Sequence, residues 1–457
     1  MWARVRPGTT VAGPARVPGD KSISHRWLLL AATADGRSSL EGLPRSLDTT
    51  STASCLARLA PSARPALEAW TSSSAVTADR HGSTWNRQAS TLDLEVLELD
   101  GEGRRSLQAP RRDLRCGNSG TTMRLLAGIV AAAPFETVLR GDQSLSARPM
   151  ERVAEPLRTM GADVTTQDGH PPLTIRGAEL RGIRFQPEVP SAQVKGAVLL
   201  AGLAADGPTT VTEAVCTRDH TERLLGALGA PVHATGRDVV LGGSFQHRGL
   251  RGRVPGDPSS AAFLLGAAAL TGGQVTLSDV GLNPTRLGFL EVLGRMGIEI
   301  AIEVEGEELG EPVGTMRLAS IAAPGPVRVS ATELPSVIDE VPLLAAVAAH
   351  ADGPSRFEGA GELRVKESDR LSVLADGLRA LGAAAQVEGD DLVLGGGGLA
   401  GGSARSASDH RIAMALTVTA LAAGAPSEID AAESAAVSFP GFFDLVRTLG
   451  GDVEVIP

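Results

Sequence analysis

Positively charged side chains recur beside the starts of expected helices along this chain. In "VPGDKSISHRWLLLAATADG" a Pro-Gly-Asp turn leads into an apolar run, and Ser22 or Ser24 is the expected N-cap. The positive end of a helix dipole disfavours cations, so a bound anion would explain why they occur there. The set comprises Lys21, Arg26, Arg124, Lys195 and Arg411 in one group of helices, and Arg148, Arg218, Lys366 and Arg370 near the starts of another. Any one of them could be a solvated surface residue, but their repetition favours phosphate or carboxylate binding.

Two carboxylates and one imidazole in the same loops are candidates for proton transfer. Asp339, in "PSVIDEVPLLAA", enters an almost wholly apolar helix, where a carboxylate without a partner is costly. Its alternative role is to cap that helix. The alternative for Glu367, which lies beside Lys366, is a solvated ion pair without a catalytic role. The alternative for His410 is a purely structural role.

Several other kinds of chemistry find no support in the sequence. The GxxxxGK[ST], HExxH and paired CxxC motifs are lacking, which leaves an enzyme of anionic small molecules without a dinucleotide. Cys55, Cys116 and Cys216 are far apart and form neither a disulfide framework nor a zinc pattern. We therefore expect a reducing, cytoplasmic location.

The bulk composition limits the partners of the chain. Its net charge of −10 argues against a nucleic-acid surface or an anionic membrane surface. No apolar stretch approaches the roughly 18 residues that span a bilayer. At 457 residues the chain exceeds what one core usually serves, so two domains are expected. A monomer is expected as well.

A unit of fold repeats six times along the chain. Each copy runs from a Gly, Ser, Pro or Asp turn into an Ala/Leu-rich helix that lacks a polar face and should therefore be buried. A short β-like piece and a second, amphipathic helix follow, and a Gly after that helix leads into another strand. The six buried helices are expected within "VPGDKSISHRWLLLAATADG", "RCGNSGTTMRLLAGIVAAAP", "VPSAQVKGAVLLAGLAADG", "VPGDPSSAAFLLGAAALTGG", "LPSVIDEVPLLAAVAAHADG" and "SASDHRIAMALTVTALAAGA".

Six β-α-β-α-β-β units indicate an α/β protein of two domains with three units each. We expect the first domain over 17–245 and the second over 246–457, completed by residues 1–16, with a linker around "GGSFQHRGLRGRVPGD". The polar stretch 71–112 in the first unit could be a longer hairpin or a mobile loop.

Ten short motifs in order carry a resemblance over almost the whole chain. They are "GDKSISHR", "GNSGTTMR", "RPM", "PSAQVKGA", "TRDHTE", "VPGDPSSAAF", "IDE", "RVKESDRL", "SDHRIAM" and "SFPGFF". Together they resemble the 5-enolpyruvylshikimate-3-phosphate synthase family. The resemblance implies two domains of three βαβαββ repeats each, an inside-out α/β barrel, with the ligand cleft between them.

The resemblance also implies a reaction, in which the enolpyruvyl group of phosphoenolpyruvate moves to the 5-hydroxyl of shikimate 3-phosphate and phosphate leaves. This is a step of chorismate and aromatic amino-acid biosynthesis that passes through a tetrahedral ketal and needs no metal or cofactor. Asp339 would take the hydroxyl proton, Lys21 and Glu367 would serve the enolpyruvyl carbon, and His410 joins the catalytic set. Shikimate 3-phosphate would be held by Lys21, Ser22, Arg26, Ser191, Ala192, Gln193, Arg218, Asp339 and Lys366. Phosphoenolpyruvate would be held by Lys21, Asn118, Gly120, Arg148, Gln193, Arg370 and Arg411.

Three positions depart from the family pattern, and two other functions remain open. Ala192 stands where many members have a second serine, and Glu362 replaces a frequent asparagine. Val437 stands where some members carry a lysine that contacts phosphoenolpyruvate. A UDP-N-acetylglucosamine enolpyruvyl transferase would have a reactive cysteine in the loop equivalent to Gly141–Arg148, which has none here. A non-catalytic phosphoshikimate-binding homologue would be expected to lose Asp339 or Glu367.

The resemblance carries two further expectations. Glyphosate is the family's known competitor of phosphoenolpyruvate, and Gly120 leaves space for it, so a sensitive enzyme is expected. The proposed ligands come from both domains, whose cationic faces should repel each other. We therefore expect an open cleft in the absence of ligand.

Overall fold

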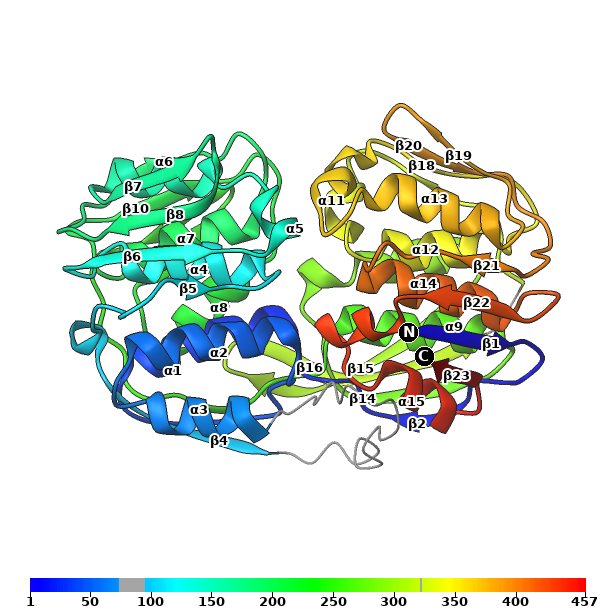
Figure 1. Cartoon of the computed structure of the whole chain (residues 1–457), viewed down its shortest axis with the longest axis horizontal. Coiled ribbons are helices and arrows are strands. Elements are labelled where there is room, and N and C mark those ends of the chain that lie inside the picture. The colour runs from blue at the N-terminus through cyan, green and yellow to red at the C-terminus, as the bar shows by residue number, and fades with distance from the viewer. Residues whose placement is uncertain (74–94, 321–322) are drawn as a thin grey trace.

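The computed structural model describes residues 1–73, 95–320 and 323–457 and forms two lobes that lie side by side (Figure 1). Both termini lie in the second lobe (Figure 1). The first lobe contains α1 (Lys21–Thr33), β3 (Asp35–Glu41), α2 (Leu47–Leu59), α3 (Arg64–Ser73), β4 (Val96–Glu102), η1 (Arg104–Ser106), β5 (Leu114–Arg115), α4 (Gly120–Val130), β6 (Glu136–Arg140), α5 (Gln143–Ser146), α6 (Glu151–Met160), β7 (Asp163–Gln167), β8 (His170–Arg176), β9 (Arg184–Phe185), α7 (Ala192–Gly202), β10 (Thr209–Thr212), α8 (His220–Ala227), β11 (Val232–Thr235), β12 (Asp238–Leu241) and β13 (Arg251–Arg253).

The second lobe begins with the N-terminal strands of the chain and continues after β13. It contains β1 (Trp2–Arg6), β2 (Gly13–Ala15), α9 (Pro258–Leu270), β14 (Val275–Gly281), η2 (Pro284–Arg286), α10 (Gly288–Arg295), β15 (Glu299–Glu308), β16 (Glu311–Ser320), β17 (Arg328–Val329), α11 (Leu334–Val337), α12 (Val341–Ala348), β18 (Ser355–Phe357), η3 (Ala360–Val365), α13 (Arg370–Ala380), β19 (Ala385–Glu388), β20 (Asp391–Leu394), β21 (Ser403–Ala404), α14 (His410–Leu421), β22 (Ser427–Asp430), η4 (Ala432–Val437), α15 (Phe442–Thr448) and β23 (Asp452–Ile456).

Each lobe is built around three buried helices, as their lack of a polar face predicts. In the first lobe α4 packs against α1 and α7, and in the second α14 packs against α9 and α12. In α9 every residue from Pro258 to Ala269 is buried. Each fully buried Leu or Phe side chain there contributes about 1.5–3 kcal/mol of transfer free energy.

Aspartate and serine side chains begin most of these helices. The N-cap of α1 is Asp20, whose carboxylate accepts a hydrogen bond from the Ile23 amide, so the expectation of Ser22 or Ser24 was wrong. Helix formation starts at Lys21 because the Pro-Gly turn ends at Asp20, itself a strong N-cap residue.

The strands of the described residues form six sheets, one for each repeat. In the second repeat β5 runs parallel to β6, and β6, β8 and β7 pair antiparallel in that order. The third repeat has the same order with β9, β10, β12 and β11. In four repeats the buried helix (α4, α7, α12 or α14) lies in the connection between two paired parallel strands, as in a βαβ unit.

Three strands, β1, β2 and β13, pair with strands that lie far from them in the sequence. β1 lies between β22 and β23, and β2 pairs parallel with β14, so residues before Val17 belong to second-lobe sheets. β13 pairs parallel with β3, and Leu250 and Val254 pack in the core of the first lobe. We therefore propose that the first domain extends to Val254 instead of ending at residue 245. The sequence alone could not show the partner of so short a strand.

Part of the polar stretch 71–112 has a regular structure. β4 pairs antiparallel with β3 along its whole length, but α2 and α3 separate the two strands in sequence, so this pairing is not a hairpin within the stretch. Residues 74–94 of that stretch lie outside the described residues. Within the described part of the chain, no helix is both long and apolar enough to cross a membrane.

Candidate active site

The carboxylate of Asp339 lies at the centre of a group of cations drawn from both lobes. Arg218 reaches it from the segment before α8 with an N–O distance of 2.6 Å. Three cations of the second lobe surround its other sides within 4.0 Å: Lys366, Arg370 and Arg411. Asp339 does not cap α12, whose N-cap is Glu340 and has no side-chain cap bond. The alternative in which Asp339 caps this helix is therefore wrong.

The protonation state of Asp339 follows from these contacts. Burial alone would raise the pKa of Asp339, but Arg218, with the three cations of its own lobe, holds it well below its usual range. Burial lowers the pKa of Lys366, and the Asp339 carboxylate opposes that change. Asp339 is therefore ionised and able to accept a proton, although its neighbours weaken it as a base.

Glu367 forms a second carboxylate centre in the cleft. Arg370 lies 2.5 Å from its Oε2, and Arg148 of the first lobe lies 3.6 Å from its Oε1. The hydroxyl of Ser144 donates to the Glu367 carbonyl oxygen at 2.9 Å. Burial would raise the pKa of Glu367, but Arg370 and Arg148 hold it well below its usual range.

Arg370 joins the two carboxylate centres. Its side chain is 1% exposed, and its Nε donates to Asp409 at 2.7 Å. Asp409 also caps α14, where it accepts from the Arg411 amide. His410 is buried beside it, and burial, with nearby Lys21, keeps the pKa of His410 well below its usual range. His410 is therefore neutral at neutral pH.

Three of the first-lobe residues expected to hold phosphoenolpyruvate, Asn118, Arg148 and Gln193, are hydrogen-bonded in two groups. Arg148 donates to the side-chain oxygen Oδ1 of Asn118 at 2.6 Å, and the side-chain Nδ2 of Asn118 donates to the Asp142 carboxylate. Arg124 donates to Gln193 at 2.6 Å. A methyl group on Gly120 would lie 2.7 Å from the Arg124 guanidinium and 3.5 Å from that of Arg148.

The start of α1 places its two cations differently. The Lys21 ammonium lies 3.0 Å from Asp48 and faces the cleft. Arg26 is 3% exposed, and its guanidinium donates to Thr221 and to the Ser22 carbonyl oxygen. Burial lowers the pKa of Arg26 to about 10. Arg26 thus ties α1 to α8 inside the first lobe.

One of the expected cations, Lys195 of α7, is buried. Ser191 caps this helix, and Ala192 is its first residue. Lys195 is 1% exposed and pairs with Glu213 at 2.8 Å and Glu222 at 2.6 Å. Lys195 therefore compensates buried carboxylates, and its role is structural.

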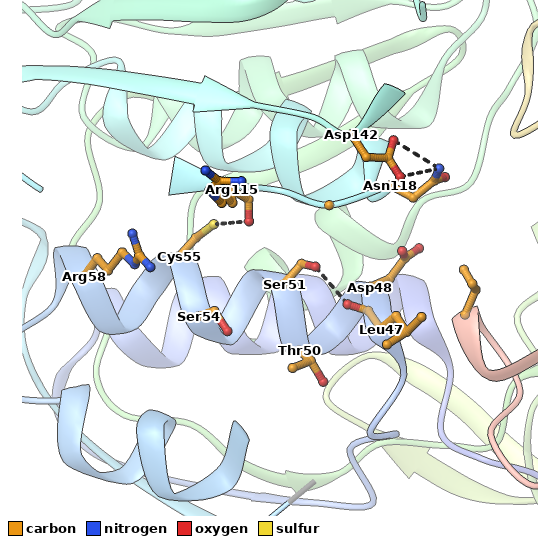
Figure 2. A pocket seen from close by; sticks show the side chains of 12 residues that line it. Leu47, Asp48, Thr50, Ser51, Ser54, Cys55, Arg58, Arg115, Asn118 and Asp142 are labelled. Carbon is orange, nitrogen blue, oxygen red and sulfur yellow. Dashed lines mark hydrogen bonds between the residues drawn. The ribbon is translucent and has the colours of Figure 1, made fainter. Parts of the chain in front are cut away.

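A pocket of about 480 Å³ lies between α2 and the loop after β5. Figure 2 shows Asp48 and Cys55 on α2 opposite Arg115 and Asn118, with the Cys55 thiol donating to the Arg115 carbonyl oxygen. Val437 of the second lobe also lines it. Val437, which stands where some members of the family carry a lysine, thus lies close to Asn118.

The two lobes are in contact across the cleft, whereas repulsion between their cationic faces was the basis for expecting an open cleft without ligand. Arg218 and Arg148 of the first lobe pair with Asp339 and Glu367 of the second. At the rim, Glu362 lies 3.9 Å from Arg152. The expectation counted only the cations, whereas carboxylates of the second lobe face the arginines of the first and attract them.

Sequence reasoning missed several residues that hold the site together. Asp48, Asp142, Ser144 and Asp409 each bind a candidate residue directly. Asp48 begins a second helix, α2, at a position similar to those where the cations were noticed. Attention to anions at the same positions would have found it.

The fold places the chain among the enolpyruvyl transferases. It superposes with a TM-score of 0.81 and 38% identity on an EPSP synthase structure from Acinetobacter baumannii, with full coverage of both chains. The enolpyruvyl transferase NikO from Streptomyces tendae has the same fold, with a TM-score of 0.74 and 18% identity, over 99% of this chain and 98% of that one.

Sequence comparison identifies the family. The EPSP synthase (3-phosphoshikimate 1-carboxyvinyltransferase) family model matches residues 5–92 and 86–446. A 3-phosphoshikimate 1-carboxyvinyltransferase of Halorhodospira halophila is 47% identical over 99% of this chain and 97% of its own length. One of Acidithiobacillus ferrooxidans is 44% identical over 99% and 98%. The chain belongs to the EPSP synthase family and is a transferase, so the predicted family, fold class and enzyme class are confirmed.

Proposed function

We propose that this chain transfers the enolpyruvyl group of phosphoenolpyruvate to the 5-hydroxyl of shikimate 3-phosphate and releases phosphate. The observation that carries the proposal is the Asp339 carboxylate within 4.0 Å of four cations from both lobes. Cations that outnumber the carboxylate at this point favour multiply anionic ligands. The names of the relatives indicate the same substrate.

Asp339 is the proposed base for the hydroxyl proton. A phosphate group that paired with Arg218 and Lys366 would take these cations away from the carboxylate. The pKa of Asp339 would then rise toward its ordinary value, and its strength as a base would increase. Binding of shikimate 3-phosphate would thus activate the group that deprotonates it.

Phosphoenolpyruvate would have a similar effect on Glu367. Its phosphate and carboxylate groups would bind Arg148, Arg370 and Arg411, two of which now pair with Glu367. The pKa of Glu367 would rise, which suits a group that exchanges a proton with carbon.

The reaction balances as an addition followed by an elimination. The hydroxyl oxygen bonds to C2 of phosphoenolpyruvate while its proton goes to Asp339, and C3 gains a proton from Lys21 or Glu367. The resulting ketal then loses phosphate from C2 and a proton from the C3 methyl group, which restores the double bond. We propose that this takes place in a monomer and in the cytoplasm, where the three unpaired cysteines would stay reduced.

Phosphate release tests the proposal directly. Purified protein is incubated with phosphoenolpyruvate and either shikimate 3-phosphate or UDP-N-acetylglucosamine. We expect release with the first acceptor only. Phosphate release with UDP-N-acetylglucosamine but not with shikimate 3-phosphate would contradict the proposal. The absence of release with both acceptors would also contradict it and would favour a non-catalytic homologue.

A further inference from the structure

The two crossings between the lobes use the same short sequence. Residues 17–20 and 254–257 both read Val-Pro-Gly-Asp, and they lie antiparallel to each other. The Asp20 amide donates to the Pro255 carbonyl oxygen at 2.7 Å, and the Asp257 amide donates to that of Pro18 at 2.9 Å. Each crossing ends in the aspartate that caps the next buried helix, α1 or α9.

One buried arginine holds both of these aspartates. Arg286, in η2 of the second lobe, lies 2.6 Å from Asp20 and 3.0 Å from Asp257. Its second amino group also donates to the Ser259 hydroxyl at 2.9 Å. Arg286 is 2% exposed and Asp20 is 0% exposed, so solvent cannot replace these contacts.

The contacts of Arg286 lead to both proton-transfer candidates. Asp20 directly precedes Lys21, and its carboxylate fixes the first turn of α1 through the Ile23 amide at 2.8 Å. Asp257 accepts from the Lys21 amide at 3.5 Å. On the other side, the Ser259 hydroxyl donates to Glu340, the residue that follows Asp339.

We propose that Arg286 is a positioning residue that fixes Lys21 of the first lobe relative to Asp339 of the second. The planar guanidinium reaches three acceptors on two loops at fixed angles, which the single ammonium of a lysine cannot do. The catalytic consequence rests on the function proposed above, whereas the geometric role of Arg286 does not.

A buried ion pair could instead serve only the stability of the fold, since removing one partner of such a pair is by itself destabilising. The two roles differ in what changes when the protein stays folded. A positioning role requires that Lys21 itself responds to the loss of Arg286. A purely structural role lowers the melting temperature and leaves Lys21 and the turnover of the folded protein unchanged.

The lysine content of the chain allows this distinction. The chain has three lysines, of which Lys195 is buried, while Lys21 and Lys366 are partly exposed in the cleft. Competitive acetylation with acetic anhydride, followed by peptide mass spectrometry, measures Lys21 against Lys366 in one sample. This ratio needs no catalytic activity, so it remains informative if the proposed reaction is wrong.

The experiment uses the full-length chain with the substitution Arg286→Lys. Arg286→Gln combined with Asp257→Asn is a second variant, in which fewer buried carboxylates lose their partner and the asparagine can still cap α9. Arg295→Lys is the matched control, because Arg295 is an exposed arginine of the same lobe that pairs with Glu333.

We expect Lys21 to be acetylated severalfold faster relative to Lys366 in both Arg286 variants, since its pair with Asp48 loosens. Turnover measured well below the melting temperature should fall roughly 10²-fold, as expected for a reacting group displaced by about 1 Å. The Arg295→Lys control should match the wild type. An unchanged acetylation ratio in a folded Arg286 variant would overturn the proposal, even if its melting temperature falls.

Discussion

Arg218 of the first lobe and Asp339 of the second form an ion pair of 2.6 Å that joins the two lobes at the centre of the candidate site. The carboxylate proposed as the base is therefore also one of the groups that join the two lobes. Under the proposed function, shikimate 3-phosphate would compete with Asp339 for Arg218. Binding, closure and activation of the base would then be coupled through one guanidinium group.

Asp339→Asn should reduce kcat by 10²–10⁴-fold, the usual contribution of a general base. The amide keeps the shape of the side chain but cannot accept the hydroxyl proton. Steady-state kinetics measures kcat, and calorimetry measures binding of shikimate 3-phosphate, which should weaken less. Asp376→Asn, on the exposed face of α13, is the control and should behave as wild type. A variant at Asp339 that kept most of its kcat would remove this residue from the role of base.

Much of the fold was predictable because the signals were local and repeated. Six apolar helices with turn residues before them and glycines after the second helices were enough to predict six units. The strands with distant partners were harder, since β13 has three residues and pairs with β3 far earlier in the chain. A pairing of such long range leaves no periodic trace in either segment.

The candidate site was predictable as a set of residue types, but not as a network. The sequence pointed to cations at helix starts, and Arg218, Arg370 and Arg411 do meet at Asp339. The sequence could not distinguish Lys195, which pairs with Glu213, from the cations that line the cleft. A buried structural cation and a ligand-binding cation look alike in sequence. Which carboxylate faces which arginine depends on side-chain contacts across the two lobes.

The stability of the protein should fall on acidification because of Asp339 and Glu367. Burial would raise the pKa of each, but Arg218 and Arg370 respectively lead the groups that hold it well below the usual range. A lowered folded-state pKa stabilises the fold above the unfolded value of roughly 4, and this contribution is lost as pH falls through the folded value. Urea unfolding between neutral pH and pH ~3 should show this loss.

Glu367→Gln provides the matched comparison for the acid transition. This variant should lose less free energy of unfolding than the wild type over the same pH range. Glu340, whose pKa burial raises, stabilises the fold at low pH instead and so cannot produce the loss. Parallel curves for wild type and Glu367→Gln would show that Glu367 does not contribute.

Gly120→Ala should weaken the binding of glyphosate more than the binding of phosphoenolpyruvate. The added methyl group would lie 2.7 Å from the end of Arg124, so that side chain must shift and the space beside it shrinks. The longer inhibitor should lose more affinity than the substrate, and the wild type should be sensitive. Inhibition constants and KM for phosphoenolpyruvate measure both effects. A wild type that resists glyphosate would contradict this prediction and would direct attention to Ala192 and Val437.

Arg411→Ala should cost roughly 2–5 kcal/mol in kcat/KM for phosphoenolpyruvate, the usual effect of removing one partner of a buried charge pair. Arg411 is 7% exposed, and its guanidinium donates to the Asp339 carbonyl oxygen at 2.7 Å. The Kd of shikimate 3-phosphate, measured by calorimetry, should change little. An equal loss for both substrates would indicate that Arg411 supports the loop of Asp339 and does not bind phosphoenolpyruvate.

Arg218→Gln should open the cleft in solution. The substitution removes the pair with Asp339, which keeps its three cations on the second lobe, and leaves the longer Arg148–Glu367 pair as the charge contact across the cleft. Small-angle scattering should give a larger radius of gyration for Arg218→Gln than for the wild type. Shikimate 3-phosphate should compact the variant only weakly, because a ligand shifts such an equilibrium by its differential affinity for the two states. Glu362→Gln is the control, since an exposed pair at 3.9 Å contributes little and its profile should match the wild type. If the Arg218→Gln profile also superimposes on the wild type, the lobes are held by contacts other than the Arg218–Asp339 pair.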